Sequence, residues 1–536
     1  MEIVSKKNKK ITIGKKNNFI KLSYFLISFF FILFFFILGG WAERYNFSQK
    51  FELFYQDLIN TTANRIHTNF SQAEKLVIDI NYKNYQKILN TRNKSLESVR
   101  ATDDMHKWVP ANLSLNGKKY NIKIKLKGIH DDHWRHPYKW SFKIKTNNEK
   151  EKKTIFGLNL FSIQNPESRG YIYEWLFMKA LKKENLISHR VKFVNVIVNG
   201  NNLGIYNLEE QHSKELIENN NRREGPIIGF DKNLWIQEIN NFNDLSVNPI
   251  EESFLRARIS PVQFKDNQIN TEQEIYLNKA IYLLDSFRNE KLKTNEVFDT
   301  TQLSKLMALK AVFGSVEFDW RDIKFYYNPI TSLLEPIGRE VHVNHEQSPL
   351  LHPWWINDDR RNFLHSVDQQ AFLKLIYDDK EFYEEYLMFL DKFSKKNYFN
   401  SVVSENIDEF NSYSRLLKKN YPLAEVYKRE YIENYRTIIR QTLDPKQGIS
   451  VNFLNYSENI LSLNISNLQR LPVEILNLEF DNGTKINFNE RILINGKSSK
   501  FKIPNETIEV KCFSQIKCEK MSIKNQYIIY KILGQN

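Results

Sequence analysis

Three acids in one short segment have the spacing to gather at the open end of a hairpin. The segment FDWRDIKFYYNPITSLLEPIGREVH, residues 318–342, places two apolar runs on either side of Asn-Pro-Ile-Thr. This tetrapeptide is a turn signal, because proline fixes one backbone angle and asparagine tolerates turn geometry. Pairing about the turn sets positions near 321 opposite 340, so Asp319, Asp322 and Glu340 meet. Carboxylates held together repel unless a cation or a shared proton lies between them, which predicts a divalent metal bound by oxygen ligands.

Basic side chains beside these acids allow a purely structural interpretation of the same hairpin. Ion pairs with Arg321, Lys324 and Arg339 would neutralise the carboxylates without any metal. The sequence alone leaves a metal site and ordinary surface ion pairs both open.

A second candidate site lies in residues 127–145, KGIHDDHWRHPYKWSFKIK. A glycine turn followed by lysines on a strand can approach and neutralise phosphate groups, as in the glycine-rich lobe of kinases. Lys127, Lys139 and Lys143 are therefore candidate nucleotide-binding residues. The same loop contains five residues of metal-ligand type, namely His130, Asp131, Asp132, His133 and His136. Adjacent loop positions rarely point at one ion, so we expect a solvated loop there.

Glu209 and Glu210 in GIYNLEEQ, residues 204–211, end a predicted strand and begin a helix. Acids at a helix start are favoured by the helix dipole in any protein, so this motif alone is weak. Its meaning comes from order along the chain: a glycine turn, strand lysines, a strand-to-helix Glu, then acids on both legs of a hairpin. That is the order of parts in phosphoryl-transfer enzymes of the kinase type.

The chain from KLKGIHDDHW through DWRDIKFYYNPITSLLEPI resembles the spore-coat protein H (CotH) kinase family, over roughly residues 75–390. VNVIVNGNNLGIYNLEEQ is similar to the family's strand, Asn-Gly turn, Gly-x-Tyr strand and terminal Glu, and PYKWSFKIK to its Lys-Ser-aromatic-Lys strand. The resemblance implies a protein-kinase-like fold that uses ATP with Mg²⁺ or Mn²⁺. It makes Lys139 the nucleotide-phosphate lysine, with Lys143 as its rival, and Glu210 the ion-pair partner.

On the hairpin, the resemblance makes Asp319 the catalytic base that accepts the proton of an acceptor hydroxyl, with Asp322 as the alternative base. Asp319 and Glu340 are the implied metal ligands. Lys324 stands where the family usually carries a metal-binding Asn, and Glu340 where it usually carries an Asp. A protonated lysine cannot coordinate a metal, and octahedral Mg²⁺ tolerates a displaced carboxylate poorly. The resemblance is thus compatible with an active kinase and with a pseudokinase.

Hydrophobic periodicity predicts an α+β fold with helical lobes over residues 271–315 and 367–445, on either side of the hairpin. Alternating patterns in LVIDINYKNY, YNIKIKLKG, WSFKIKT and VKFVNVIVNG predict strands before them. After Gly448, short strand patterns predict a small β-sandwich. The predicted order is a basic tail (1–21), a transmembrane anchor (22–41), a juxtamembrane helix or stalk (42–75), a kinase-like domain (76–446) and the β-sandwich (447–536).

LSYFLISFFFILFFFILGG, residues 22–40, is an uncharged apolar run close to the roughly 20 residues that cross a bilayer as a helix. Seven lysines precede it, so the positive-inside rule predicts a cytoplasmic N-terminus and a main body that is periplasmic or at the cell surface. A cleaved signal peptide is the alternative, because Gly40-Trp41-Ala42 is a tolerable cleavage site. The apolar run exceeds the usual length of a signal peptide, so we expect an uncleaved single-pass anchor.

Composition excludes several other classes of protein. The formal net charge is +14, but seven of the positive charges precede the apolar run, so no basic stripe of the nucleic-acid-binding type remains. Cys512 and Cys518 are the two cysteines, which excludes a disulfide framework and leaves one local bridge or two thiols open. Trp354 and Trp355 would suit a sugar-stacking platform, although packing against a helical lobe is commoner.

Three functions compete for these residues. The first is a membrane-anchored extracytoplasmic CotH-like kinase or pseudokinase, which transfers phosphate from ATP to Ser/Thr of an envelope protein or to a sugar. The second is a noncatalytic cell-surface scaffold or binding module for a glycan or protein. The third is a glycan-modifying enzyme that uses the hairpin acids, which the lack of a second carboxylate motif weakens.

Overall fold

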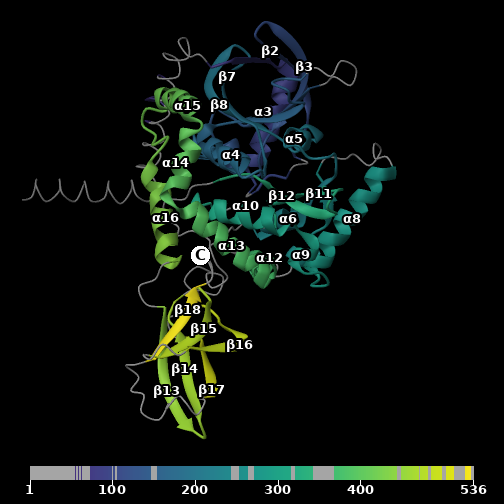
Figure 1. The fold of residues 1–536 in the computed structure, drawn as a ribbon. Coiled ribbons are helices and arrows are strands. Elements are labelled where there is room, and N and C mark those ends of the chain that lie inside the picture. The colour runs from purple at the N-terminus through teal and green to yellow at the C-terminus, as the bar shows by residue number, and fades with distance from the viewer. Residues whose placement is uncertain are drawn as a thin grey trace, which may run out of the picture.

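The computed structural model describes most of the chain after residue 72. The described residues form a mixed α and β structure with a closed barrel, sheets and a layer of helices (Figure 1). None of their helices is both long and apolar enough to cross a bilayer. The predicted anchor (22–41), Asp319, both cysteines and the tryptophan pair lie outside them. The described residues are 73–98, 100–102, 105–146, 154–242, 253–262, 271–315, 320–341, 367–443, 448–469, 471–480, 485–497, 503–511 and 526–532, with Tyr55, Leu58, Ile59 and Thr62.

The closed barrel lies at one end of the molecule, in the order β1-β2-β3-β4-β5-β8-β7 (Figure 1). Successive side chains of a strand point to opposite faces. Ile124 and Leu126 of β3 and Phe142 and Ile144 of β4 are buried in the barrel core, and lysines alternate with them. The barrel strands are β1 (Lys75–Asp79), β2 (Val109–Leu115), β3 (Lys118–Leu126), β4 (Phe142–Thr146), β5 (Leu160–Gln164), β7 (Val191–Val198) and β8 (Asn201–Glu210).

The strand predicted over residues 76–85 is wrong in its second half. The first strand β1 ends at Asp79, and helix α3 (Tyr82–Leu96) follows. The Asn81 side chain accepts a hydrogen bond from the backbone N–H of Asn84 at 2.9 Å, which caps the first turn of this helix. An N-cap of this kind satisfies a helical N–H that otherwise has no partner, so it outweighs a short alternating pattern.

The predicted hairpin forms with the predicted register. Lys324 lies opposite Ile337 and Asn328 opposite Leu333, so the two legs converge where position 321 faces 340. The hairpin belongs to a five-stranded sheet in the order β10-β9-β11-β12-β6. Its strands are β6 (Ile187–Ser188), β9 (Ile227–Phe230), β10 (Ile259–Pro261), β11 (Lys324–Asn328) and β12 (Leu333–Gly338).

Helices lie between the barrel and the C-terminal strands (Figure 1). Both predicted helical lobes are confirmed, and α10 packs against α13 and α4 within one apolar core. Besides α3, the helices of the described residues are η2 (Asp131–His133), η3 (Pro166–Arg169), α4 (Tyr173–Lys183), α5 (Lys214–Asn219), α6 (Asn233–Phe242), α7 (Ser253–Arg256), α8 (Thr271–Arg288), α9 (Thr294–Val297), α10 (Thr300–Val312), α12 (Val367–Tyr377), α13 (Lys380–Ser394), α14 (Lys396–Ser404), α15 (Ile407–Asn420) and α16 (Arg429–Leu443).

The C-terminal strands form two three-stranded sheets, β13-β14-β17 and β16-β15-β18. Alternating side chains of β14 and β15, such as Leu463 and Ile475, are buried in one apolar cluster, as expected for packed sheets. These strands lie at the far end of the molecule from the barrel and do not reach the cavity described below (Figure 1). They are β13 (Ile449–Ser457), β14 (Ile460–Asn467), β15 (Val473–Phe480), β16 (Lys485–Ile494), β17 (Asn505–Lys511) and β18 (Gln526–Ile532).

Candidate functional site

A cavity of about 580 Å³ lies between the barrel and the five-stranded sheet. Residues from the barrel end of β3, from η3 and from both legs of the hairpin contribute to its wall. Both the loop predicted to bind phosphate and the hairpin therefore face one space. The basic side chains of the wall are Lys127, Lys143, Arg169, Lys232, Arg321, Lys324 and Arg339, and its acidic side chains are Asp131, Asp132, Asp231, Asp322 and Glu340.

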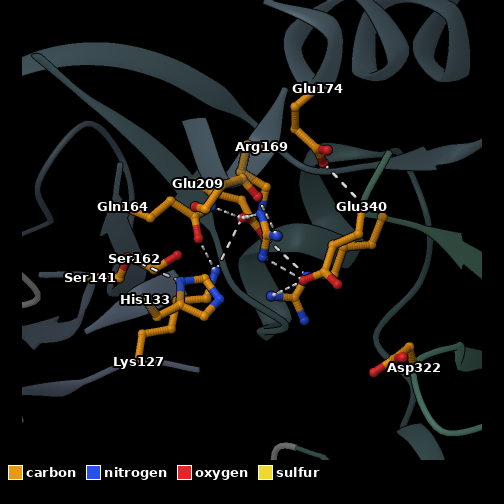
Figure 2. Close-up of polar contacts among 12 residues, drawn as sticks. Lys127, His133, Ser141, Ser162, Gln164, Arg169, Glu174, Glu209, Asp322 and Glu340 are labelled. Atoms are coloured by element: carbon orange, nitrogen blue, oxygen red, sulfur yellow. Dashed lines mark hydrogen bonds and ion pairs between the residues drawn. The ribbon is translucent and has the colours of Figure 1, made fainter. Parts of the chain in front are cut away.

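The centre of the site is the Glu209 carboxylate, which is 0% exposed. Lys127 lies 3.3 Å from it (Nζ to Oε2), and Arg339 2.9 Å (Nε to Oε1). Arg169 approaches the same carboxylate at 3.5 Å (Nε to Oε2). Gln164 accepts from the Lys127 ammonium at 2.7 Å and donates its amide to Glu209. One buried anion thus holds three cations in place (Figure 2).

The predicted pair of Lys139 with Glu210 is not the one that forms at this site. Glu210 is buried and pairs with Arg190, with 2.6 Å between Oε1 and the guanidinium. Lys139 is also buried, donates to the Tyr421 hydroxyl, and lies 4.7 Å from the centroid of that ring. The described structure gives both residues structural partners, and neither lines the cavity.

The lysine–glutamate ion pair found at the cavity wall is that of Lys127 with Glu209. Tyr206 and Leu208 of β8 belong to the barrel core, so the alternation of the strand turns Glu209 to the other side, toward the cavity wall. Lys127 was the third lysine candidate in the sequence, and it follows β3 directly. Lys143 also lines the cavity, from β4.

Two of the hairpin acids are found at the cavity, each with a basic partner. Glu340 Oε1 lies 2.6 Å from Arg169 and 3.2 Å from Arg339. Asp322 Oδ1 lies 2.7 Å from Lys232. Figure 2 shows Arg169 between Glu209 and Glu340, with Asp322 apart from this cluster. Ion pairing with Arg339 was expected from the sequence, whereas the role of Arg169 was not.

The backbone at Glu340 is held in an unfavourable conformation. Its φ of 53° lies in the left-handed region, which costs a non-glycine residue roughly 1 kcal/mol or more. The buried Glu174 carboxylate of α4 accepts from the backbone N–H groups of Glu340 at 3.2 Å and Val341 at 2.8 Å. The Lys310 ammonium donates to the Glu340 carbonyl at 2.9 Å. Backbone strain fixed by surrounding groups is common at functional sites.

The loop after β3 forms part of the cavity wall. The expectation of a solvated loop is wrong for His133, the buried one of its five residues of metal-ligand type. His133 is 6% exposed, and its Nδ1 lies 3.0 Å from the Ser141 hydroxyl. Gly128 has a φ of 89°, and a Cβ there would lie 1.8 Å from the His133 ring. Only glycine therefore permits this close turn beside Lys127.

Burial controls the protonation of the central groups. It lowers the pKa of Lys127 to about 7, despite the opposing attraction of Glu209. Burial also acts to raise the pKa of Glu209, but Lys127, Arg339 and Arg169 hold it well below its usual range. The site therefore contains a fixed anion and a lysine whose charge responds to a ligand near neutral pH.

The described residues do not fit Mg²⁺ or Mn²⁺. No group of three or more His, Cys, Asp or Glu side chains in this part of the chain is placed to hold a metal ion. Glu340 and Asp322 already pair with basic side chains, and Mg²⁺ requires several well-placed oxygen ligands. Asp319, the other implied ligand, lies outside the described residues.

The sequence did not reveal four residues of the site, namely Arg169, Glu174, Gln164 and Lys232. Arg169 lies in the short helix η3 and Glu174 in the first turn of α4, where an arginine and an acid are ordinary residues. Their role depends on contacts with Glu209 and with the end of β12, far along the chain. A buried position for Glu174 on the apolar face of a helix is the signal that would have drawn attention to it.

The buried acid Glu174 generates a testable pH dependence. Burial, with repulsion from Glu209, raises its pKa from 4.5 to about 7. The folded protein keeps a proton that the unfolded chain loses between these values, so the contribution of Glu174 to stability is present below pH 4.5 and lost as the pH rises to about 7. We predict that the free energy of unfolding of Glu174→Gln rises by about 3 kcal/mol relative to that of the wild type as the pH is raised across this window. The measurement is denaturant unfolding of the full-length protein at a series of pH values. A difference that stays constant with pH would contradict this assignment.

Comparison with known proteins adds little to this geometry. No protein-family model and no curated protein matches the chain. Among solved structures, it is similar to a chain from Shewanella oneidensis MR-1, in a complex described as a toxin antitoxin system of HipA, HipB and operator DNA, at 10% sequence identity. The match covers 52% of this chain and 60% of that chain, with a TM-score of 0.23. A likeness at this score carries no argument about function.

Proposed function

We propose that the chain is a membrane-anchored, kinase-like protein similar to the CotH family, which binds ATP in the cavity as a noncatalytic module. The buried ion pair of Lys127 with Glu209 at the cavity wall carries this proposal. A lysine that is oriented by a buried Glu beside a glycine turn is the arrangement with which kinases hold nucleotide phosphates. Gly128 supplies that turn here.

The charge of the cavity supports a phosphate ligand. Lys127, Arg169 and Arg339 converge on one wall, and arginine guanidinium groups match phosphate oxygens in two-point hydrogen bonding. The volume of about 580 Å³ is within the range of small-molecule and cofactor pockets. We expect these three residues to bind the phosphates.

The proposed location is outside the cytoplasm. The apolar run over residues 22–40 and the lysines before it support an anchor with a cytoplasmic N-terminus. The partner would then be an envelope protein or a glycan at the cell surface. The scarcity of ATP outside the cytoplasm is compatible with a binding or regulatory role better than with rapid turnover.

Phosphate transfer to a Ser/Thr hydroxyl is the second candidate function. Asp322 favours it, because this carboxylate lines the same cavity as Lys127. Lys232 holds Asp322 in its charged form, with its pKa below the usual range although burial opposes this, so the carboxylate is available to accept a hydrogen bond from an acceptor hydroxyl. The misfit of the described carboxylates to Mg²⁺ places this candidate second.

Binding of ATP tests the first proposal directly. We predict that Lys127→Ala lowers the affinity for ATP at least about tenfold, because a charge-assisted hydrogen bond to phosphate is lost. The matched control is Lys123→Ala. Lys123 belongs to β3, the strand that Lys127 follows, but lies outside the cavity, so this variant is expected to keep the wild-type affinity. The measurement is a titration of full-length protein with a fluorescent ATP analogue, and circular dichroism checks that each variant folds. Equal affinity in wild type and Lys127→Ala would refute the assignment.

Transfer of labelled phosphate separates the two candidates. The noncatalytic proposal predicts that full-length protein incubated with γ-labelled ATP and Mg²⁺ or Mn²⁺ places no label on its own Ser/Thr residues or on added envelope proteins. Label transfer that is lost in Asp322→Asn, with unchanged affinity for ATP, would establish the kinase instead.

A further inference from the structure

We infer that the cavity binds the polyphosphate of its nucleotide directly on guanidinium and ammonium groups, without a divalent cation, and that Glu340 occupies the phosphate position when the site is empty. This inference rests on the proposed function, because it specifies how the same cavity takes ATP.

The first step is the convergence of two guanidinium groups on one oxygen. Arg169 lies 2.6 Å and Arg339 3.2 Å from Glu340 Oε1. Both arginines also reach Glu209, which is fully buried and cannot leave. The two arginines are thus pre-organised by Glu209 and present donors to a second anion at the cavity wall, a position that Glu340 now fills.

The second step is that Glu340, unlike Glu209, is able to move away. Its side chain is 19% exposed, whereas the Arg169 side chain is 3% exposed. Its backbone is fixed by Glu174 and Lys310, so displacement requires only rotation of the side chain. A phosphate group that replaces this carboxylate would keep both arginines paired and would bring more charge and more acceptor oxygens.

The third step is the charge balance without a metal. Three cations, Lys127, Arg169 and Arg339, face two carboxylates, Glu209 and Glu340, in the connected network. Rotation of Glu340 out of this network removes one of the two carboxylates, and a bound phosphate that restores the proton of Lys127 then meets three cations and one carboxylate in it. In kinases this neutralising charge comes from metal ions bound by carboxylates.

A divalent ion at Glu340 would instead meet unfavourable surroundings. It would approach an oxygen that already has two guanidinium groups within 3.2 Å. Like charges at such separations repel strongly in a partly buried site. Metal binding would therefore require both arginines to move away from Glu340, although each is held in place by an ion pair with Glu209.

Two substitutions distinguish the inferred binding from metal-mediated binding. Glu340→Gln removes the competing anion, so direct binding predicts that ATP binds about tenfold more tightly in EDTA. If Glu340 is a metal ligand, the same variant weakens binding in Mg²⁺. Arg339→Gln removes a phosphate donor and is expected to weaken binding in EDTA about tenfold. Arg223→Gln is the matched control, because Arg223 does not line the cavity and pairs with Glu272 at the surface, so this variant is expected to keep the wild-type affinity.

The experiment is calorimetric titration of full-length protein and these variants with ATP, in EDTA and in excess Mg²⁺. Direct binding predicts dissociation constants that agree within about threefold in the two conditions, together with tighter binding by Glu340→Gln. Binding that requires Mg²⁺ and weakens in Glu340→Gln would overturn the inference and leave ATP binding intact. Absence of ATP binding in both conditions would overturn the proposed function as well, and tripolyphosphate that also fails to bind in EDTA would exclude any direct phosphate site.

Discussion

The buried carboxylate of Glu209 is the interaction on which the candidate site depends. Removing a charge from water is costly unless partners compensate it, and Glu209 has no exposed surface. Its three cationic partners come from different parts of the chain: Lys127 follows β3, Arg169 belongs to η3, and Arg339 follows β12. Loss of any one partner leaves the others to satisfy the buried charge. The site can therefore exist only when the barrel and the five-stranded sheet are both formed and adjoin each other.

The end of the hairpin depends on the same arrangement. Arg339 reaches Glu209, and the next residue, Glu340, adopts a left-handed backbone conformation. Glu174 of α4 and Lys310 of α10 hold that backbone by hydrogen bonds. The helices therefore position the end of the hairpin from which Arg339 reaches Glu209 of the barrel. Because Glu209 is ionised and the pKa of Glu174 is raised to about 7, the two buried acids differ in charge below about pH 7. This difference, together with the three basic partners of Glu209, lowers the repulsion between the two buried acids.

Features with local physical causes were predictable from the sequence. The Asn-Pro-Ile-Thr turn determines the register of β11 against β12, and that register is enough to place Asp322 and Glu340 at one end of the hairpin. The glycine turn with its lysines was also recognisable. The choice between Glu209 and Glu210 was not, because neighbouring strand residues face opposite sides and only the barrel closure defines which side is the cavity. Arg169 was hidden for a similar reason, since its partners lie 40 and 171 positions away in the chain.

In the proposed complex, ATP phosphates bind at Lys127, beside Glu209. Burial lowers the pKa of Lys127 to about 7, so this side chain is mostly neutral at pH 8, and a bound phosphate would restore its proton. The most direct test is calorimetric titration of full-length protein with ATP at pH 8, in buffers of different ionisation enthalpy. If the phosphates bind at Lys127, we expect uptake of about one proton for each ATP bound. Binding of ATP without proton uptake would contradict it.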